Sequence, residues 1–170
     1  PLAGLTKLTK LNLSTAGFIS NIGPLANLRN LTELYLAGNQ ITDISPLKGL
    51  TKLETLNLSS NKITDLKPLA GLKNLEVLRL NSNRITDLKP LAGLTKLETL
   101  DLSYNHITDL TSLAALTNLT DLTLSSNEIT DLRPLAGLKN LRGLGLRHNP
   151  IPDEQKAMLK KALPNCKITF

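Results

Sequence analysis

The chain repeats itself every 22 residues, and this period constrains the fold more than any other feature. A unit that begins at Leu31 reads LTELYLAGNQITDISPLKGLTK, and an earlier unit of 23 residues begins at Leu8. The pattern starts again at Leu53, Leu75, Leu97, Leu119 and Leu141. Units of this length cannot bury their apolar face alone, so they stack into a solenoid with one continuous core.

We therefore expect one domain over residues 1–170, without room for a large second domain. Its expected parts are a partial repeat (1–7), the repeats 8–30, 31–52, 53–74, 75–96, 97–118 and 119–140, and a last repeat with a C-terminal cap (141–170).

Seven apolar columns run through the units, and they predict the local structure. Positions 1, 4 and 6 are Leu in every unit, and position 11 is Ile from Ile41 to Ile151. The stretch x-Leu-x-Leu-x alternates with a period of two, which predicts a short strand that buries one face. The segment T-D-L-x-P-L does not alternate, and its Pro suits the first turn of a short 3₁₀-like or irregular helix.

Two polar columns accompany the apolar ones. Asn recurs at position 9 from Asn39 to Asn149, and Asp recurs at position 13 from Asp43 to Asp153. We expect the amides to be buried and bonded to backbone groups of their own and neighbouring units. The Asp side chains should accept backbone N–H bonds at the following turn, a role that we favour over a calcium site.

The signature L-x-x-L-x-L-x-x-N-x-I/L is that of leucine-rich repeats, and the 22-residue period with T-D-L-x-P-L closely resembles the bacterial internalin-like class. The resemblance implies an α/β fold: a right-handed, curved solenoid with a parallel sheet on the concave face and short turns on the convex face. It also implies binding of a protein partner through the concave face, and a secreted or cell-surface location in a bacterium if the chain is natural.

The two ends depart from the repeat. Residues 153–163 predict a capping helix with Asp153 as its N-cap, and the alternation of Cys166, Ile168 and Phe170 predicts a last strand. Cys166 is then a small buried hydrophobe. The first unit has Ala16 in place of Asn, and no helical cap precedes it. We expect either a longer parent chain or self-association through this end.

Outward strand positions supply the candidate binding residues. Most of them are small and polar, whereas binding hot spots favour Tyr, Trp and Arg. The candidates are Glu33, Tyr35, Arg79, Asp101, Tyr104, Asp121, Arg147 and His148. The hypothesis centres on Tyr35, Arg79, Asp101 and Tyr104.

Other classes of function have little support in the sequence. The net charge is +6, but the basic residues are interleaved with Asp and form no stripe with stacking aromatics, so we expect no nucleic-acid partner. We also expect no catalytic residues, metal or cofactor, since nucleophile, phosphate-loop and metal-ligand motifs are missing. No apolar run is long enough for a membrane span. The function that we favour is non-enzymatic protein recognition, and the alternative is an engineered, consensus-like scaffold without an evolved ligand.

Overall fold

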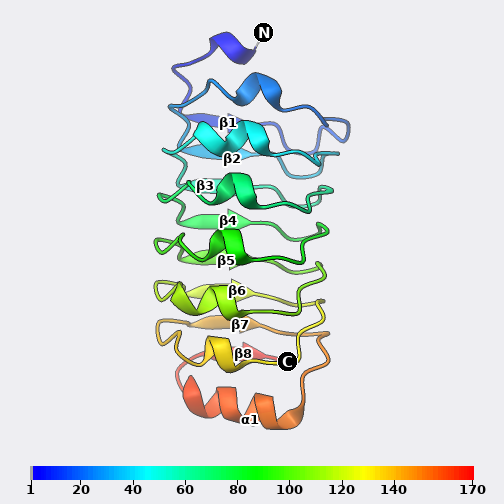
Figure 1. Cartoon of the computed structure of the whole chain (residues 1–170), viewed down its shortest axis with the longest axis vertical. Coiled ribbons are helices and arrows are strands. Elements are labelled where there is room, and N and C mark those ends of the chain that lie inside the picture. The colour runs from blue at the N-terminus through cyan, green and yellow to red at the C-terminus, as the bar shows by residue number, and fades with distance from the viewer. Residues whose placement is uncertain (1) are drawn as a thin grey trace.

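The computed structural model describes residues 2–170 and shows a stack of short turns, each contributing one strand to an open parallel sheet (Figure 1). The sheet has eight strands in chain order, from β1 to β8. Their bounds are β1 Lys10–Asn12, β2 Glu33–Tyr35, β3 Thr55–Asn57, β4 Val77–Arg79, β5 Thr99–Asp101, β6 Asp121–Thr123, β7 Gly143–Gly145 and β8 Lys167–Thr169. The predicted leucine-rich repeat solenoid is confirmed.

Strand formation follows from the alternation of Leu with polar residues. In β2, Leu34 is fully buried, whereas Glu33 and Tyr35 on either side are partly exposed. The register repeats without a slip, because Leu34 pairs with Leu56 and Leu56 with Leu78. A shift by one residue would turn the whole Leu column to solvent, so burial fixes the register.

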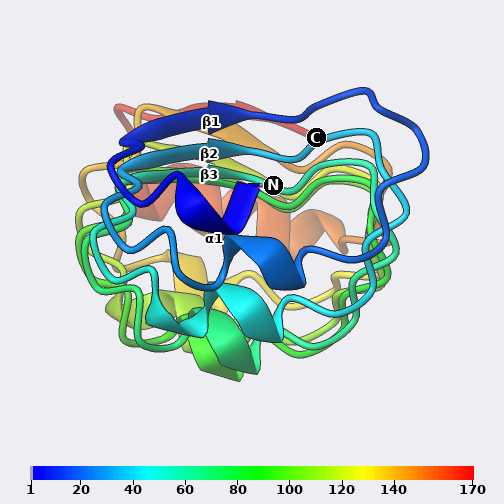
Figure 2. The same cartoon turned by 90° about the horizontal axis from the view of Figure 1, so that it is seen from above.

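Within residues 2–170, seven 3₁₀ helices lie on the side of the solenoid opposite the sheet (Figure 2). Their bounds are η1 Leu2–Gly4, η2 Gly23–Leu25, η3 Ser45–Gly49, η4 Lys67–Leu69, η5 Lys89–Leu91, η6 Thr111–Ala115 and η7 Arg133–Leu135. Proline occupies the first turn of five of these helices, η2 to η5 and η7, where its missing N–H costs no hydrogen bond.

From Asp43 to Asp131, the Asp column has the predicted structural role at these turns. The Oδ1 atom of Asp65 accepts the backbone N–H of Lys67 at 2.9 Å, and Asp109 accepts that of Thr111 at 2.8 Å. Asn21 makes the same bond to Gly23 in the first unit. Each side chain thus closes an Asx turn that directs the chain into the 3₁₀ helix.

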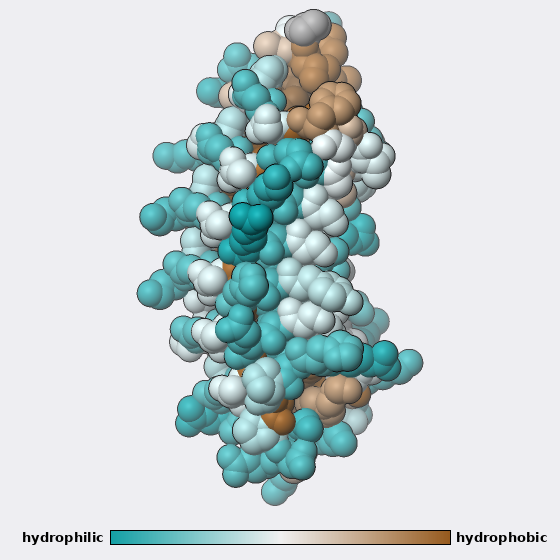
Figure 3. Space-filling model, turned by 90° about the vertical axis from the view of Figure 1, so that its right-hand side faces the viewer, coloured by the Kyte–Doolittle hydropathy of each residue, from teal (hydrophilic) through white to brown (hydrophobic). Residues whose placement is uncertain are grey.

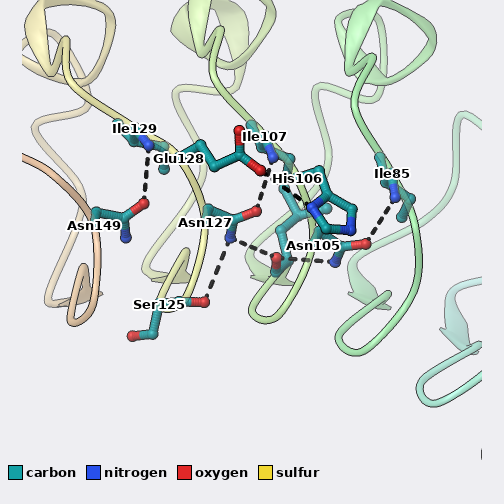
Figure 4. A network of polar contacts seen from close by, with 10 residues as sticks. Ile85, Asn105, His106, Ile107, Ser125, Asn127, Glu128, Ile129 and Asn149 are labelled. Atoms are coloured by element: carbon teal, nitrogen blue, oxygen red, sulfur yellow. Dashed lines mark hydrogen bonds and ion pairs between the residues drawn. The ribbon is translucent and has the colours of Figure 1, made fainter.

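A ladder of buried asparagines joins consecutive turns (Figure 4). The Oδ1 atom of Asn105 accepts the N–H of Ile85, 20 residues earlier, at 3.0 Å. Its Nδ2 atom donates to the carbonyls of Leu80 at 3.1 Å and Leu102 at 3.0 Å. The same bonds recur at Asn61, Asn83, Asn127 and Asn149. The predicted structural role of this column is therefore confirmed.

The C-terminal end is covered by helix α1 (Asp153–Ala162) and strand β8, as the sequence predicted. Leu159 and Leu163 are buried, and the side-chain oxygen of Gln155 accepts the N–H of Leu132 at 3.0 Å. The cap therefore supplies both apolar contacts and a polar partner to the turn beneath it.

Two details of the cap differ from the prediction. The N-cap is Pro152, and Asp153 is the first helical residue, where it pairs with Lys156 at 2.8 Å. Proline cannot cap through its side chain, so the acidic first turn of α1 interacts with the helix dipole instead. Cys166 is only partly buried, and its desolvation raises the pKa of its thiol.

Hydrophobic side chains are least covered in the first unit. Leu8, Leu11 and Leu13 are partly buried, whereas their counterparts from Leu31 onward are fully enclosed. Phe18 is 79% exposed and Leu5 is 49% exposed. Figure 3 shows the resulting gathering of hydrophobic residues at this end of the molecule.

Candidate protein-binding face

The solvent-facing side of the parallel sheet, called the concave face below, carries two ordered rows of side chains. The strand register aligns position 3 of each unit in one row and position 5 in a second row. Five of the eight candidates occupy these rows: Glu33, Tyr35, Arg79, Asp101 and Asp121. Neighbouring strands lie about 4.8 Å apart, so residues on adjacent strands can interact directly.

Tyr35 belongs to a small polar cluster that holds its ring in place. Its hydroxyl donates to Glu33 Oε2 at 3.1 Å, and the other carboxylate oxygen of Glu33 pairs with the ammonium of Lys10 on β1. Two hydrogen bonds lower the pKa of Glu33 below its usual range: the bond from Lys10 has the larger effect, and the bond from Tyr35 has the smaller one. Hydrogen bonding to Glu33 raises the pKa of the Tyr35 phenol.

Arg79 and Asp101 lie opposite each other on β4 and β5, but their side chains have different surroundings. Arg79 is exposed and has no ion-pair partner among residues 2–170. Asp101 is half-buried, and its Oδ1 accepts the N–H of Ser103 at 3.0 Å and the Ser103 hydroxyl at 2.8 Å. Asp101 therefore has a local structural role, and Arg79 is the cation available to a partner.

Tyr104 and His148 lie at the rim, just beyond the strands, in a conformation that the sequence did not reveal. Their φ angles are 55° and 58°, in the left-handed region, and the equivalent residues Thr15, Ser60, Ser82 and Ser126 share it. A tyrosine in this region is strained, since glycine or asparagine adopts it more readily. Tyr104 is 62% exposed, so its ring is not held by packing.

The remaining candidates lie toward the C-terminal end. Asp121 begins β6, and Arg147 follows β7; both are exposed. The eight candidates thus extend along the concave face from β2 to the residues after β7, and Arg79, Asp101 and Asp121 lie on the three consecutive strands β4 to β6.

Sequence reasoning missed several residues on this face. Lys10 was not among the candidates, although its position in the same column as Glu33 could have indicated the cross-strand ion pair. Gly143, Gly145 and Lys167 line a hollow beside Asp121 and Arg147. Paired glycines at outward strand positions were the available signal for this hollow, because they leave the sheet without side chains.

Metal-ligating side chains are not clustered in residues 2–170. That part of the chain contains no group of three or more His, Cys, Asp or Glu side chains arranged to hold a metal ion. The ring of His106 meets Glu128 of the next unit at 3.1 Å, which is a contact between exposed neighbours on adjacent turns (Figure 4). No helix in the described residues has the length and apolar character that crossing a membrane requires.

Comparisons with known proteins identify the class of this solenoid. The family model for leucine-rich repeats (2 copies) matches residues 29–71, 73–115 and 117–157. A comparison with curated proteins gives no match.

Three solved bacterial proteins share the fold. An internalin (InlF) from Listeria monocytogenes is 39% identical with a TM-score of 0.89; the match covers 98% of this chain and 48% of that one. Internalin C2 (InlC2) from the same organism is 40% identical with a TM-score of 0.91, over 99% and 73% of the two chains. A leucine-rich repeat protein from Leptospira interrogans is 35% identical with a TM-score of 0.94, over 99% and 44%.

This chain therefore spans less than half of two of these structures and about three quarters of the third. The repeat-model match over most of the chain and the identity to internalins agree with the architecture. The chain belongs to the leucine-rich repeat family, in its bacterial internalin-like class.

Proposed function

We propose that this chain is a non-enzymatic recognition module that binds a protein partner through its concave face, with Tyr35 and Arg79 as the principal anchors. Leucine-rich repeat proteins of this class generally act as protein-binding modules. The observation that carries the proposal is the Tyr35 ring, whose hydroxyl bonds to Glu33, in a row that also contains Arg79, which is exposed and has no ion pair among residues 2–170.

The two anchors complement each other in chemistry and position. Tyr35 and Arg79 occupy the same row, with Asn57 between them, so they lie about 10 Å apart along the sheet. A ring that is already held by Glu33 loses little conformational entropy on binding. Aromatic and guanidinium groups also dominate measured binding hot spots.

The experiment is a paired capture. The wild-type chain and a Tyr35→Ala/Arg79→Ala double variant are immobilised and exposed to lysate and surface extract from the source bacterium and to extracts from cells that it contacts. A Lys67→Ala/Lys89→Ala variant is the matched control, because both lysines lie in 3₁₀ helices on the opposite side of the solenoid.

We expect a protein that the wild type and the control retain and that the double variant loses by about tenfold or more, corresponding to ~1.4 kcal/mol or more. All three chains should have the same melting temperature, since neither anchor is in the core. Equal capture by the double variant would contradict the assignment of the anchors.

An engineered scaffold without an evolved ligand is the competing proposal. Its support is the near-identity of successive units and the small polar side chains that fill most of the concave face. This proposal predicts that no extract yields a protein retained by the wild type and lost by the double variant.

We also propose that two copies of the 170-residue chain associate through the first unit. The support is the exposure of Leu5 and Phe18, together with an apolar hollow of about 200 Å³ at the same end of the chain, which is lined by Leu2, Leu13, Ile19 and other residues. Light scattering at high protein concentration should detect a dimer that a Leu5→Ser/Phe18→Ser variant cannot form. A strictly monomeric wild-type chain would exclude this association.

A further inference from the structure

Two polar contacts in series connect Lys10, Glu33 and Tyr35 on the concave face. The ammonium of Lys10 pairs with Glu33 Oε1, and the Tyr35 hydroxyl donates to Glu33 Oε2 at 3.1 Å. Each oxygen of the carboxylate therefore has its own partner. Bonds to both oxygens fix the plane of a carboxylate, whereas a bond to one oxygen leaves the group free to rotate.

The strand register explains why these three side chains meet. Lys10 on β1 lies directly opposite Glu33 on β2, at one strand spacing. Tyr35 follows Glu33 by two residues on the same strand and the same face, about 7 Å further along. The Tyr35 ring must lie back along β2 to bring its hydroxyl to the carboxylate, so the bond to Glu33 decides the direction of the ring.

The side chains beside Tyr35 are engaged elsewhere. The register places Asn12 of β1 and Asn57 of β3 on either side of it. The Oδ1 atom of each amide accepts the backbone N–H two residues further on, at 2.9 Å for Asn12 and 3.0 Å for Asn57. Glu33 is thus the group that holds the Tyr35 hydroxyl.

Lys10 can influence Tyr35 in two ways only. Its side chain is 68% exposed, whereas that of Glu33 is 28% exposed. Replacing Lys10 therefore removes no buried contact. Any change at Tyr35 has to pass through the orientation of Glu33 or through the loss of the Lys10 charge.

We propose that Lys10 is a positioning residue of the partner-binding face, which holds Glu33 so that Glu33 in turn fixes the rotamer of Tyr35. The single phenolic proton is then directed at Glu33, and the lone pairs of the hydroxyl oxygen are what Tyr35 presents to a partner. A ring fixed in this way loses less conformational entropy on binding. This inference rests on the proposed function, because Tyr35 is one of its two anchors.

The titration of the Tyr35 phenol tests the inference without a partner. A Tyr104→Phe background leaves Tyr35 as the only tyrosine of the chain, so phenolate absorbance reports on it alone. The hydrogen bond to Glu33 raises the pKa of Tyr35, whereas the positive charge of Lys10 lowers it. The two routes from Lys10 to Tyr35 therefore predict changes of opposite sign.

We expect Lys10→Met to lower the pKa of Tyr35 toward its ordinary value, because a released Glu33 no longer holds the hydroxyl. Loss of the Lys10 charge alone would raise that pKa. Lys10→Arg should restore the wild-type titration, since the guanidinium keeps the ion pair. Lys10→Thr is a second variant without the pair, and the same row of the sheet already contains Thr55 and Thr99.

A double-variant cycle locates the effect at Glu33. In a Glu33→Gln background, Lys10→Met should no longer lower the pKa of Tyr35. Lys62→Met is the matched control, because Lys62 is exposed and has no ion pair among residues 2–170; it should leave the titration unchanged. A Tyr35 pKa that stays constant or rises in both Lys10→Met and Lys10→Thr would overturn the inference.

The capture experiment separates this inference from the proposed function. Lys10→Met should retain a captured partner about three- to tenfold less well than the wild type does, and Lys10→Arg should retain it equally. A lowered pKa with undiminished retention would support the link from Lys10 to Tyr35 and count against Tyr35 as an anchor. An unchanged pKa, with a partner that the Tyr35→Ala/Arg79→Ala variant loses, would preserve the proposed function and reject the positioning role of Lys10.

Discussion

Replacing Asn105 by alanine tests whether the asparagine ladder holds the solenoid together. Asn105 is 5% exposed, and it makes hydrogen bonds to backbone groups of two consecutive turns. The N–H of Ile85 has the Asn105 side chain as its partner, and alanine leaves this buried donor without one. The carbonyls of Leu80 and Leu102 lose the same amide.

The expected cost follows from these groups. An unsatisfied buried polar group costs about 1–3 kcal/mol. The Ile85 donor is left unsatisfied, whereas the Leu80 and Leu102 carbonyls keep the amides of Asn83 and Asn127, so the free energy of unfolding should fall by roughly 2–4 kcal/mol. This is a large share of the 5–15 kcal/mol that is typical of a folded domain.

Urea denaturation followed by circular dichroism measures the loss. Asn149→Ala is the matched control: Asn149 makes the equivalent bonds to Ile129, Leu124 and Leu146, but it is only partly buried, so water can replace part of what is lost. We expect the control to cost less than half as much.

An Asn105→Asp variant sharpens the test. The carboxylate can still accept the Ile85 bond, but it faces the Leu80 and Leu102 carbonyls in a buried site, so its pKa should rise on folding. A raised acid pKa means that stability falls as the pH rises above the unfolded value of ~3.9. A loss below 1 kcal/mol for Asn105→Ala, or a pH-independent Asn105→Asp variant, would refute the account of the ladder.

Three further predictions concern individual side chains. Tyr104→Gly should raise stability by about 0.5–1 kcal/mol in urea denaturation, because relief of left-handed strain exceeds the added chain entropy; a lower midpoint would exclude strain at this residue. Hydrogen bonds from Thr111 hold the pKa of Asp109 below its usual range, so the stabilisation from this carboxylate is lost as the pH falls through the folded pKa. In the Asp109→Asn variant the melting temperature should therefore fall less between about pH 4 and lower pH than it does in the wild type. Glu33→Gln should lower the pKa of Tyr35 toward its ordinary value, as measured by phenolate absorbance in a Tyr104→Phe background; an unchanged titration would show that the Glu33 bond is absent in solution.

The framework of the fold could be predicted because each column has one physical task in every unit. The burial of Leu34 and its equivalents, the Asn105 bonds and the Asp109 turn each repeat with the period, so one unit predicts the others. The cap was harder to place in detail, because Asp153 continues the Asp column but stands between Pro152 and Lys156, which have no counterpart in the other units.

The candidate site depended on relations that the columns alone do not show. The side-chain direction of Lys10 toward Glu33, and the use of Asp101 to hold Ser103, depend on rotamers and local turns. The left-handed φ of Tyr104 was hidden because Thr, Ser or His occupies the same position in most other units, although Gly38 at this position of the second unit was an available signal. The hollow at Gly143 and Gly145 is an absence of side chains, and its walls come from β6 and from β8, which lies beyond the last complete repeat.

The direction of the asparagine bonds has a consequence for how the chain is made. From Ile41 to Ile129, the N–H of the Ile at position 11 of each unit bonds to an asparagine located 20 residues later, as at Ile85 and Asn105. During synthesis from the N-terminus, a turn therefore stays incomplete until most of the next turn has emerged from the ribosome. At the final turn the N–H of Ile151 bonds to the backbone oxygen of Asn149 instead, and Gln155 serves Leu132. The cap thus ends the series of asparagine bonds, in which each turn obtains its last hydrogen-bond partner from the turn that is synthesised after it.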